Sequence, residues 1–114
     1  MKALQNITLK NNDRQAIEKT VVTLKQKFPV QEVRLFGSKA RGTDDSESDI
    51  DLLVLTSRKI SWHERRAMTD ALFDIQLKYN VVVSLLVVPE TEWRTGLMTV
   101  LPIHKEIEEE GIAA

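Results

Sequence analysis

Two short segments decide how this chain folds: Gly37-Ser38-Lys39-Ala40-Arg41-Gly42 and, shortly after it, Ser48-Asp49-Ile50-Asp51-Leu52. The stretch between Gly37 and Ser48 is rich in Gly, Ser, Thr and Asp, which predicts a loop with room for one helical turn. Glu32–Phe36 before it and Asp49–Leu55 after it have the apolar patterns of strands. The sequence therefore predicts two strands joined by a loop of small and charged residues.

Helical spacing predicts two longer helices beside these strands. Ile17, Val21, Leu24 and Phe28 recur at the spacing of a helix that a capping box at Asn12 and Gln15 would open and Pro29 would end. Ser61 and Glu64 form a second capping box. Its helix carries an apolar stripe and ends at Asn80, which suits a left-handed conformation.

The remaining chain predicts one more strand and two short helices. Val81–Val88 is a β-branched run and is expected to be a strand buried on both faces. Glu90–Leu97 and Pro102–Glu110 are expected to be short helices, the second capped by Gly111. The order α-β-β-α-β-α-α predicts an α/β (α+β) fold with a small mixed sheet flanked by helices.

Length and composition limit what this chain can be. Its 114 residues suit one domain, residues 1–114, in which the weakly patterned residues 1–10 are expected to form a loose arm. The 16 basic and 17 acidic residues argue against a protein that holds nucleic acid by bulk charge, although a local basic patch stays compatible with them. Without cysteine, disulfides and thiolate metal sites are excluded.

No targeting or membrane segment is evident in this sequence. It lacks the charged, apolar and small-residue pattern of a signal peptide. It also lacks an apolar run of the roughly 18 residues that a membrane helix requires. The expected location is the cytoplasm.

Asp49 and Asp51 form the first part of a candidate site. They are two residues apart on a predicted strand, so both side chains point to one face, with Cα atoms about 6.5 Å apart. Paired like charges in a strand are costly unless a cation neutralises them. Oxygen ligands without Cys or His nearby favour Mg²⁺ or Mn²⁺ over zinc.

The loop forms the second part. Gly37 allows the backbone to approach a ligand closely, and the N–H groups of the following turn, together with the Ser38 hydroxyl, can hold a phosphate. Lys39 and Arg41 add positive charge, one of them facing water, and Gly42 lets the chain turn back. A Walker A loop is excluded because Thr43 and Asp44 stand where Lys and Ser or Thr are required. A phosphate cradle beside a metal-binding pair suits a nucleoside triphosphate.

The combined motif, Gly37-Ser38-x-Ala40-Arg41-Gly42 with Ser48-Asp49-x-Asp51-Leu52, resembles the signature of the DNA polymerase β-like nucleotidyltransferases. Its strongest resemblance is to the minimal nucleotidyltransferases (MNT) of bacteria and archaea. These are often the antitoxin of a pair with a HEPN-domain partner. The resemblance implies a polymerase β-like nucleotidyltransferase fold. It also implies a partner of HEPN type or a second copy of this chain.

The resemblance further implies a role for each matching residue. Gly37 and Ser38 would bind the β- and γ-phosphates, Arg41 and Gly42 would complete the phosphate loop, and Asp49 and Asp51 would ligate Mg²⁺. An acceptor hydroxyl would attack the α-phosphorus of a nucleoside triphosphate, with ATP expected and AMP transferred. The acceptor would be a protein or another hydroxyl compound.

One position departs from the family pattern. The family usually has a third carboxylate on a later strand, where this chain has Ser84, and general-base help is worth roughly 10²–10⁴-fold in rate. Two hypotheses follow: an active nucleotidyltransferase, or a catalytically impaired module that binds and blocks a partner. The carboxylates that could stand in for the missing one are Asp44, Asp45, Glu47, Asp70, Asp74 and Glu90.

Overall fold

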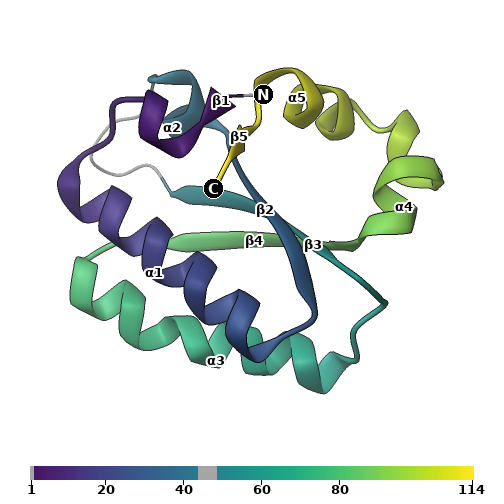
Figure 1. The fold of residues 1–114 in the computed structure, drawn as a ribbon, viewed down its shortest axis with the longest axis horizontal. Helices are drawn as coiled ribbons and strands as arrows, with labels where there is room; N and C mark the ends of the chain where they lie inside the picture. Colours follow the sequence, from purple (N-terminus) through teal and green to yellow (C-terminus); the bar gives the residue numbers. More distant parts are fainter. Residues whose placement is uncertain (1, 44–48) are drawn as a thin grey trace.

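A mixed sheet of five strands runs through the centre of the molecule in a computed structural model, which describes residues 2–43 and 49–114 (Figure 1). The strand order is β1-β5-β2-β3-β4. β3 is antiparallel to β2 and parallel to β4. The elements, in chain order, are β1 (Lys2–Ala3), η1 (Leu4–Asn6), α1 (Asn11–Lys27), β2 (Val30–Phe36), α2 (Ser38–Arg41), β3 (Ile50–Thr56), α3 (Trp62–Tyr79), β4 (Val83–Pro89), α4 (Glu90–Thr95), η2 (Leu97–Val100), α5 (Pro102–Glu110) and β5 (Ile112–Ala113).

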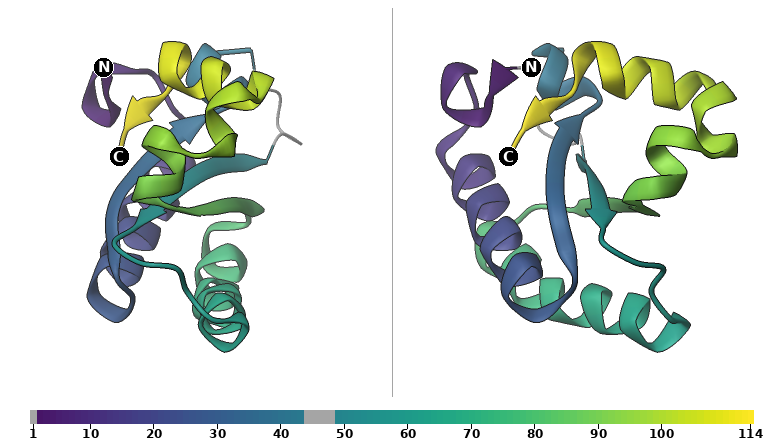
Figure 2. Two further views of the ribbon diagram at one scale, coloured as in Figure 1. Left: turned by 90° about the vertical axis from the view of Figure 1, so that its right-hand side faces the viewer. Right: turned by 45° about the vertical axis from the view of Figure 1, so that its right-hand side comes forward.

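Helices cover both faces of the sheet, as the two views of Figure 2 show. The alternation of side chains along β3 explains why: Leu52 and Val54 belong to a core cluster with residues of α1 and α3, whereas Leu53 and Leu55 belong to a second cluster with Trp93 of α4 and Ile107 of α5. A strand that is apolar on both faces must be covered on both. The expected mixed sheet flanked by helices is confirmed.

The first helix begins one residue before the expected capping box. α1 starts at Asn11, its N-cap is Lys10, and no side chain caps it, so the prediction of a box at Asn12 was wrong. The Asn12 amide group instead donates a hydrogen bond of 3.0 Å to the backbone carbonyl of Tyr79. Asn12 therefore satisfies a carbonyl at the end of α3 rather than an N–H of its own helix.

The second capping box is confirmed. The Ser61 hydroxyl accepts from the Glu64 N–H at 3.1 Å, and the Glu64 carboxylate accepts from the Ser61 N–H at 3.0 Å. A hydrogen bond from Arg58, followed by the one from the Ser61 backbone, lowers the pKa of Glu64 to about 2. Asn80 ends the helix with φ of 53°, the left-handed conformation expected of it.

Replacing Ser61 with alanine should destabilise the fold by about 1 kcal/mol, because α3 loses its N-terminal acceptor. Urea denaturation followed by circular dichroism measures this difference. Ser57→Ala is the matched control, since the Ser57 hydroxyl reaches only a carbonyl at 3.5 Å. Equal stability of the two variants would show that the capping box contributes nothing measurable.

The strand predicted at Val81–Val88 forms as β4 at the edge of the sheet; its two faces pack against the two core clusters, but most of its side chains are only partly buried. Within β4 only Val88 is fully buried. Side chains of α3 cover part of its edge: the Gln76 amide oxygen accepts from the Val83 N–H at 2.8 Å, and Arg65 lies 3.4 Å from the Leu85 carbonyl oxygen. Such coverage limits pairing with foreign strands.

Two short strands attach the chain ends to the sheet. β1 pairs in parallel with β5, which itself pairs with β2. The Arg14 guanidinium donates to the carbonyls of Leu4 and Ile7 at 2.9 and 2.6 Å. Residues 2–10 therefore differ from the loose arm that their weak pattern suggested. None of the helices in the described ranges is long and apolar enough to cross a membrane.

Candidate functional site

The start of β3 carries the acidic pair to one end of the sheet. Asp49 immediately precedes the strand and is exposed, and Asp51 is half-buried inside it. Asp51 pairs with Phe36 of β2 on one side and Ser84 of β4 on the other. By strand alternation Asp51 faces the same side as Leu53 and Leu55, the side that α5 covers.

The Gly37 turn lies directly against the Asp51 carboxylate. A Cβ atom built on Gly37 would be 2.4 Å from Asp51 Oδ2, and Gly37 has φ of +78°. Only glycine accommodates both the left-handed conformation and the close approach. The turn continues into α2, in which Ser38 is the first residue, and Gly42 ends α2 in a left-handed conformation. The structure thus brings together Gly37, Ser38 and Asp51, as the motif predicts.

Replacing Gly37 with alanine should displace this turn, because the added Cβ collides with Asp51 and the backbone angle is unfavourable for L-residues. We expect a loss of stability of roughly 1–3 kcal/mol. The loss is measured by thermal unfolding. Gly42→Ala is the comparison variant for stability, because its φ of +74° is also positive but its Cβ would meet nothing within 4 Å. Equal losses of stability in the two variants would show that the close approach of Gly37 to Asp51 adds no cost.

Burial and neighbouring charges disfavour the ionised form of Asp51. Burial raises the pKa of Asp51 most, and the neighbouring Asp49 charge raises it further. Arg41 opposes this shift, and Glu106 adds to it. Asp49 therefore lies within electrostatic range of Asp51, and their repulsion is the feature that a bound divalent cation would relieve. Hard carboxylate oxygens fit Mg²⁺ or Mn²⁺.

Arg41 connects the α2 turn to α5. Its guanidinium donates to Glu106 at 2.9 Å and lies 3.4 Å from Glu110, both on α5. Sequence reasoning missed Glu106. The available signal was the spacing of Glu106 and Glu110, which places two carboxylates on one side of a helix.

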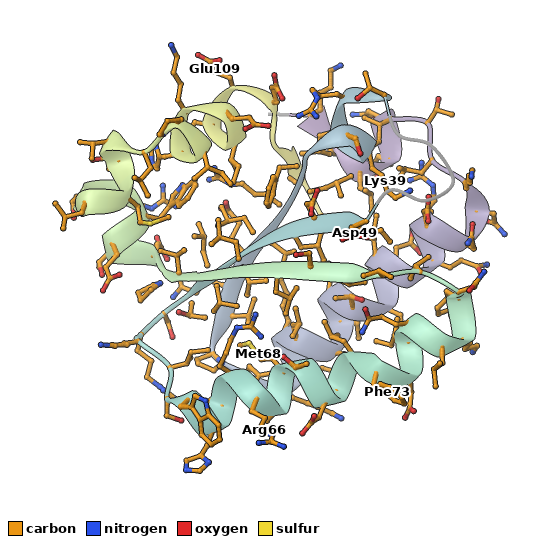
Figure 3. All side chains as sticks on the ribbon, turned by 180° about the vertical axis from the view of Figure 1, so that it is seen from behind. Lys39, Asp49, Arg66, Met68, Phe73 and Glu109 are labelled. Atoms are coloured by element: carbon orange, nitrogen blue, oxygen red, sulfur yellow. The ribbon has the colours of Figure 1, made fainter. Side chains whose placement is uncertain are left out.

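Lys39 points into the protein rather than toward solvent. Its ammonium forms a 2.9 Å ion pair with Asp13 of α1, and both side chains are almost completely buried. The expectation that one of the two loop cations faces water is confirmed, because Arg41 is exposed and Lys39 is buried. Figure 3 labels Lys39 and Asp49 at the same end of the molecule.

Ser84, the residue expected in place of a third carboxylate, lies beside Asp51 in the sheet. Ser84 is the exposed residue directly paired with Asp51 in the parallel register. Of the possible substitutes, Asp70 and Asp74 are exposed on α3, and Glu90 forms an ion pair with Arg94 at 3.0 Å. Asp44, Asp45, Glu47 and Ser48 lie outside the described residues. Within residues 2–43 and 49–114, no three acidic or histidine side chains are grouped to hold a metal ion.

The chain is similar in sequence to known proteins. The family model described as "Polymerase beta, Nucleotidyltransferase" matches residues 18–94. The chain is 32% identical over 102 residues to "Putative protein adenylyltransferase MJ0604" of Methanocaldococcus jannaschii, covering 88% of this chain and 95% of that relative.

Solved structures share the fold. The crystal structure of a toxin–antitoxin with AMP-PNP aligns with a TM-score of 0.60 at 21% identity, over 91% of this chain and 72% of that one. The tri-AMPylated Shewanella oneidensis HEPN toxin in complex with MNT antitoxin gives a TM-score of 0.54 at 18% identity, over 88% and 69% of the two chains.

Proposed function

Because this chain belongs to the Polymerase beta, Nucleotidyltransferase family, we propose that it transfers AMP from ATP to a hydroxyl group of a partner protein. The observation that carries this proposal is the contact between the Gly37 turn and Asp51. It places the backbone and hydroxyl groups that suit a polyphosphate beside the carboxylates that suit its cation.

Each residue of the site has a separate task in this reaction. The Ser38 hydroxyl and the N–H groups of its turn would hold the outer phosphates. Arg41 would exchange its contacts with Glu106 and Glu110 for a phosphate oxygen. Asp49 and Asp51 would hold Mg²⁺, which supplies charge stabilisation for the attacking and leaving oxygens.

The reaction balances without a further reagent. The acceptor hydroxyl oxygen forms a bond to the α-phosphorus of ATP, and the bond from that phosphorus to the pyrophosphate oxygen breaks. The hydroxyl proton passes to solvent, since Ser84 stands where the family carries a carboxylate. The site would therefore position its substrates well and accept the proton poorly.

The similar proteins support a protein as the acceptor of AMP. The M. jannaschii relative is named as a protein adenylyltransferase, and one structural neighbour is an MNT antitoxin bound to an AMPylated HEPN toxin. A HEPN-type protein is accordingly the proposed partner, and a second copy of this chain is the alternative acceptor.

Labelled ATP tests this function directly. The chain is incubated with a HEPN-type partner, and ATP is labelled either at the α-phosphate or at the γ-phosphate. We expect Mg²⁺-dependent incorporation of the α-label alone, since pyrophosphate leaves. Incorporation of the γ-label would indicate phosphoryl transfer instead. Absence of both labels, together with no calorimetric heat for ATP and Mg²⁺, would refute the proposal.

A second candidate function is a partner-binding module with little or no catalysis. Ser84 favours it, because the position beside Asp51 lacks the charge of a third carboxylate. A stable complex with the HEPN-type partner on gel filtration, without label transfer and unchanged in an Asp51→Asn variant, would support this alternative.

A further inference from the structure

We propose that the buried ion pair between Asp13 and Lys39 positions the phosphate-binding turn, which makes Asp13 a positioning residue of the site. This inference rests on the proposed function. It concerns two residues to which the motif assigns no ligand contact, one of them on a helix far away in sequence.

The α2 turn is oriented by the contacts that its side chains make with other elements. It comprises four residues, Ser38–Arg41, between two glycines of positive φ. Its internal hydrogen bonds are short-range: the Arg41 N–H reaches the Gly37 carbonyl at 3.2 Å, and the Thr43 N–H reaches the Ser38 carbonyl at 3.0 Å. Arg41 holds the far end of the turn through its ion pairs with α5, and Lys39 provides an anchor directly after Ser38. The second contact is the one that bears most directly on the direction of the Ser38 hydroxyl.

The ion pair supplies that anchor from a rigid element. Asp13 lies in the first turn of α1, a helix of 17 residues whose neighbouring Ala16 and Ile17 are fully buried in the core. Asp13 and Lys39 are each 4% exposed, and the Nζ–Oδ2 distance is 2.9 Å. A charge pair buried this deeply is sensitive to geometry, because either partner left alone is an uncompensated charge in a medium of low polarity.

The Asp13–Lys39 pair is also better suited to fixing the orientation of the α2 turn than to stabilising the fold. An apolar pair of similar volume would stabilise the core as well or better, so buried charges are retained where a specific geometry matters. Lys39 adjoins Ser38 on the turn, and Ser38 adjoins Gly37, which contacts Asp51. Rotation at Lys39 therefore changes both the phosphate cradle and its distance from the acidic pair.

Three variants distinguish a positioning role of the ion pair from a direct phosphate contact of Lys39 and from a purely stabilising role. They are Asp13→Asn, Lys39→Met and the double variant. We expect each single variant to weaken binding of ATP with Mg²⁺ by about tenfold to a hundredfold, the loss that follows from ångström-scale misplacement. The double variant should bind no more weakly than the worse single one, because both changes remove the same interaction. Calorimetry is done below the unfolding temperature of every variant.

Two results of this titration would overturn the proposal. If Lys39 contacted phosphate itself, Asp13→Asn would release it and leave binding unchanged or tighter, while Lys39→Met alone would weaken it. If the pair only stabilised the fold, affinity would be unchanged in all three folded variants. Leu24→Ala is the matched control for stability, since Leu24 is fully buried at the other end of α1. It should lower the unfolding temperature and keep the affinity.

Amide hydrogen exchange tests, without any nucleotide, whether the ion pair between Asp13 and Lys39 holds the turn in place. In Asp13→Asn the N–H groups of Arg41 and Thr43 should exchange at least about tenfold faster, whereas those of β3 change only with global stability. Unchanged exchange in the turn would refute the anchoring role. If the wild-type protein bound no ATP, the proposed function would fail, and this exchange result would still decide whether the pair holds the turn.

Discussion

The Asp51→Asn variant will fail to transfer AMP and will bind ATP with Mg²⁺ at least roughly 100-fold more weakly than the wild-type chain. Loss of an outer-shell partner of a metal costs about 10–100-fold in affinity, and loss of a direct ligand should cost no less. Asparagine keeps the shape of the side chain and its place between Phe36 and Ser84. The decisive measurements are calorimetry with ATP in Mg²⁺ or EDTA and incorporation of α-labelled ATP.

The same substitution should stabilise the protein in the absence of nucleotide and metal. Burial and the Asp49 charge raise the pKa of Asp51 in the folded state. A raised pKa means that the folded state binds the proton more tightly than the unfolded state. The contribution of Asp51 to stability is therefore greatest below its unfolded pKa and is lost as the pH rises through the folded value. At neutral pH the ionised side chain weakens the fold, and asparagine removes that cost.

We expect the unfolding temperature of Asp51→Asn to rise by roughly 1–3 °C at pH 7 without Mg²⁺, a shift of the size that a small free-energy gain produces in a domain of this length. The gain should shrink as the pH is lowered through the raised pKa of Asp51, because the wild-type side chain then becomes protonated. Asp70→Asn is the control, since Asp70 is exposed on α3. If Asp51→Asn lost stability, or still bound ATP in an Mg²⁺-dependent way, Asp51 would not be part of the site.

Introducing aspartate at Ser84 should increase the rate of AMP transfer by about 10²–10⁴-fold, the range that general-base catalysis typically supplies. Asp51 and Ser84 are paired in the parallel register of β3 and β4, about 4.8 Å apart as neighbouring strands are. Because Ser84 is exposed, a carboxylate can be placed there without entering the core. The rate is measured as α-label incorporation at saturating ATP.

The Ser84→Asp variant should also depend more strongly on Mg²⁺ for stability. Three carboxylates repel one another without a cation, so its unfolding temperature without Mg²⁺ should fall below that of the wild type. Addition of Mg²⁺ should then raise it more than it raises the wild type, since only the folded site binds the ion. Ser84→Asn is the isosteric control for both measurements. An unchanged rate would favour the partner-binding module over the enzyme.

The strands and helices that surround the site were largely predictable, because their causes are local. Ser61 and Glu64 satisfy each other's backbone within four residues, and Asn80 needs no tertiary partner to end a helix. The apolar alternation of β2 also required the observed orientation of Val33 and Leu35. Asn12 shows the limit of such reasoning: its capping ability was recognised, but its acceptor is the carbonyl of Tyr79, distant in sequence.

By itself, the sequence determined that two carboxylates share one face of a strand and that a glycine-bounded turn precedes them, since both follow from backbone geometry over a few residues. Only the tertiary structure decided that Gly37 lies against Asp51 and that β4 is an edge strand. Among the described residues it also decided that Lys39 pairs with Asp13 and that Arg41 pairs with Glu106 and Glu110. Opposite charges on a chain have many alternative partners, and it is the packing of helices against the sheet that selects among them.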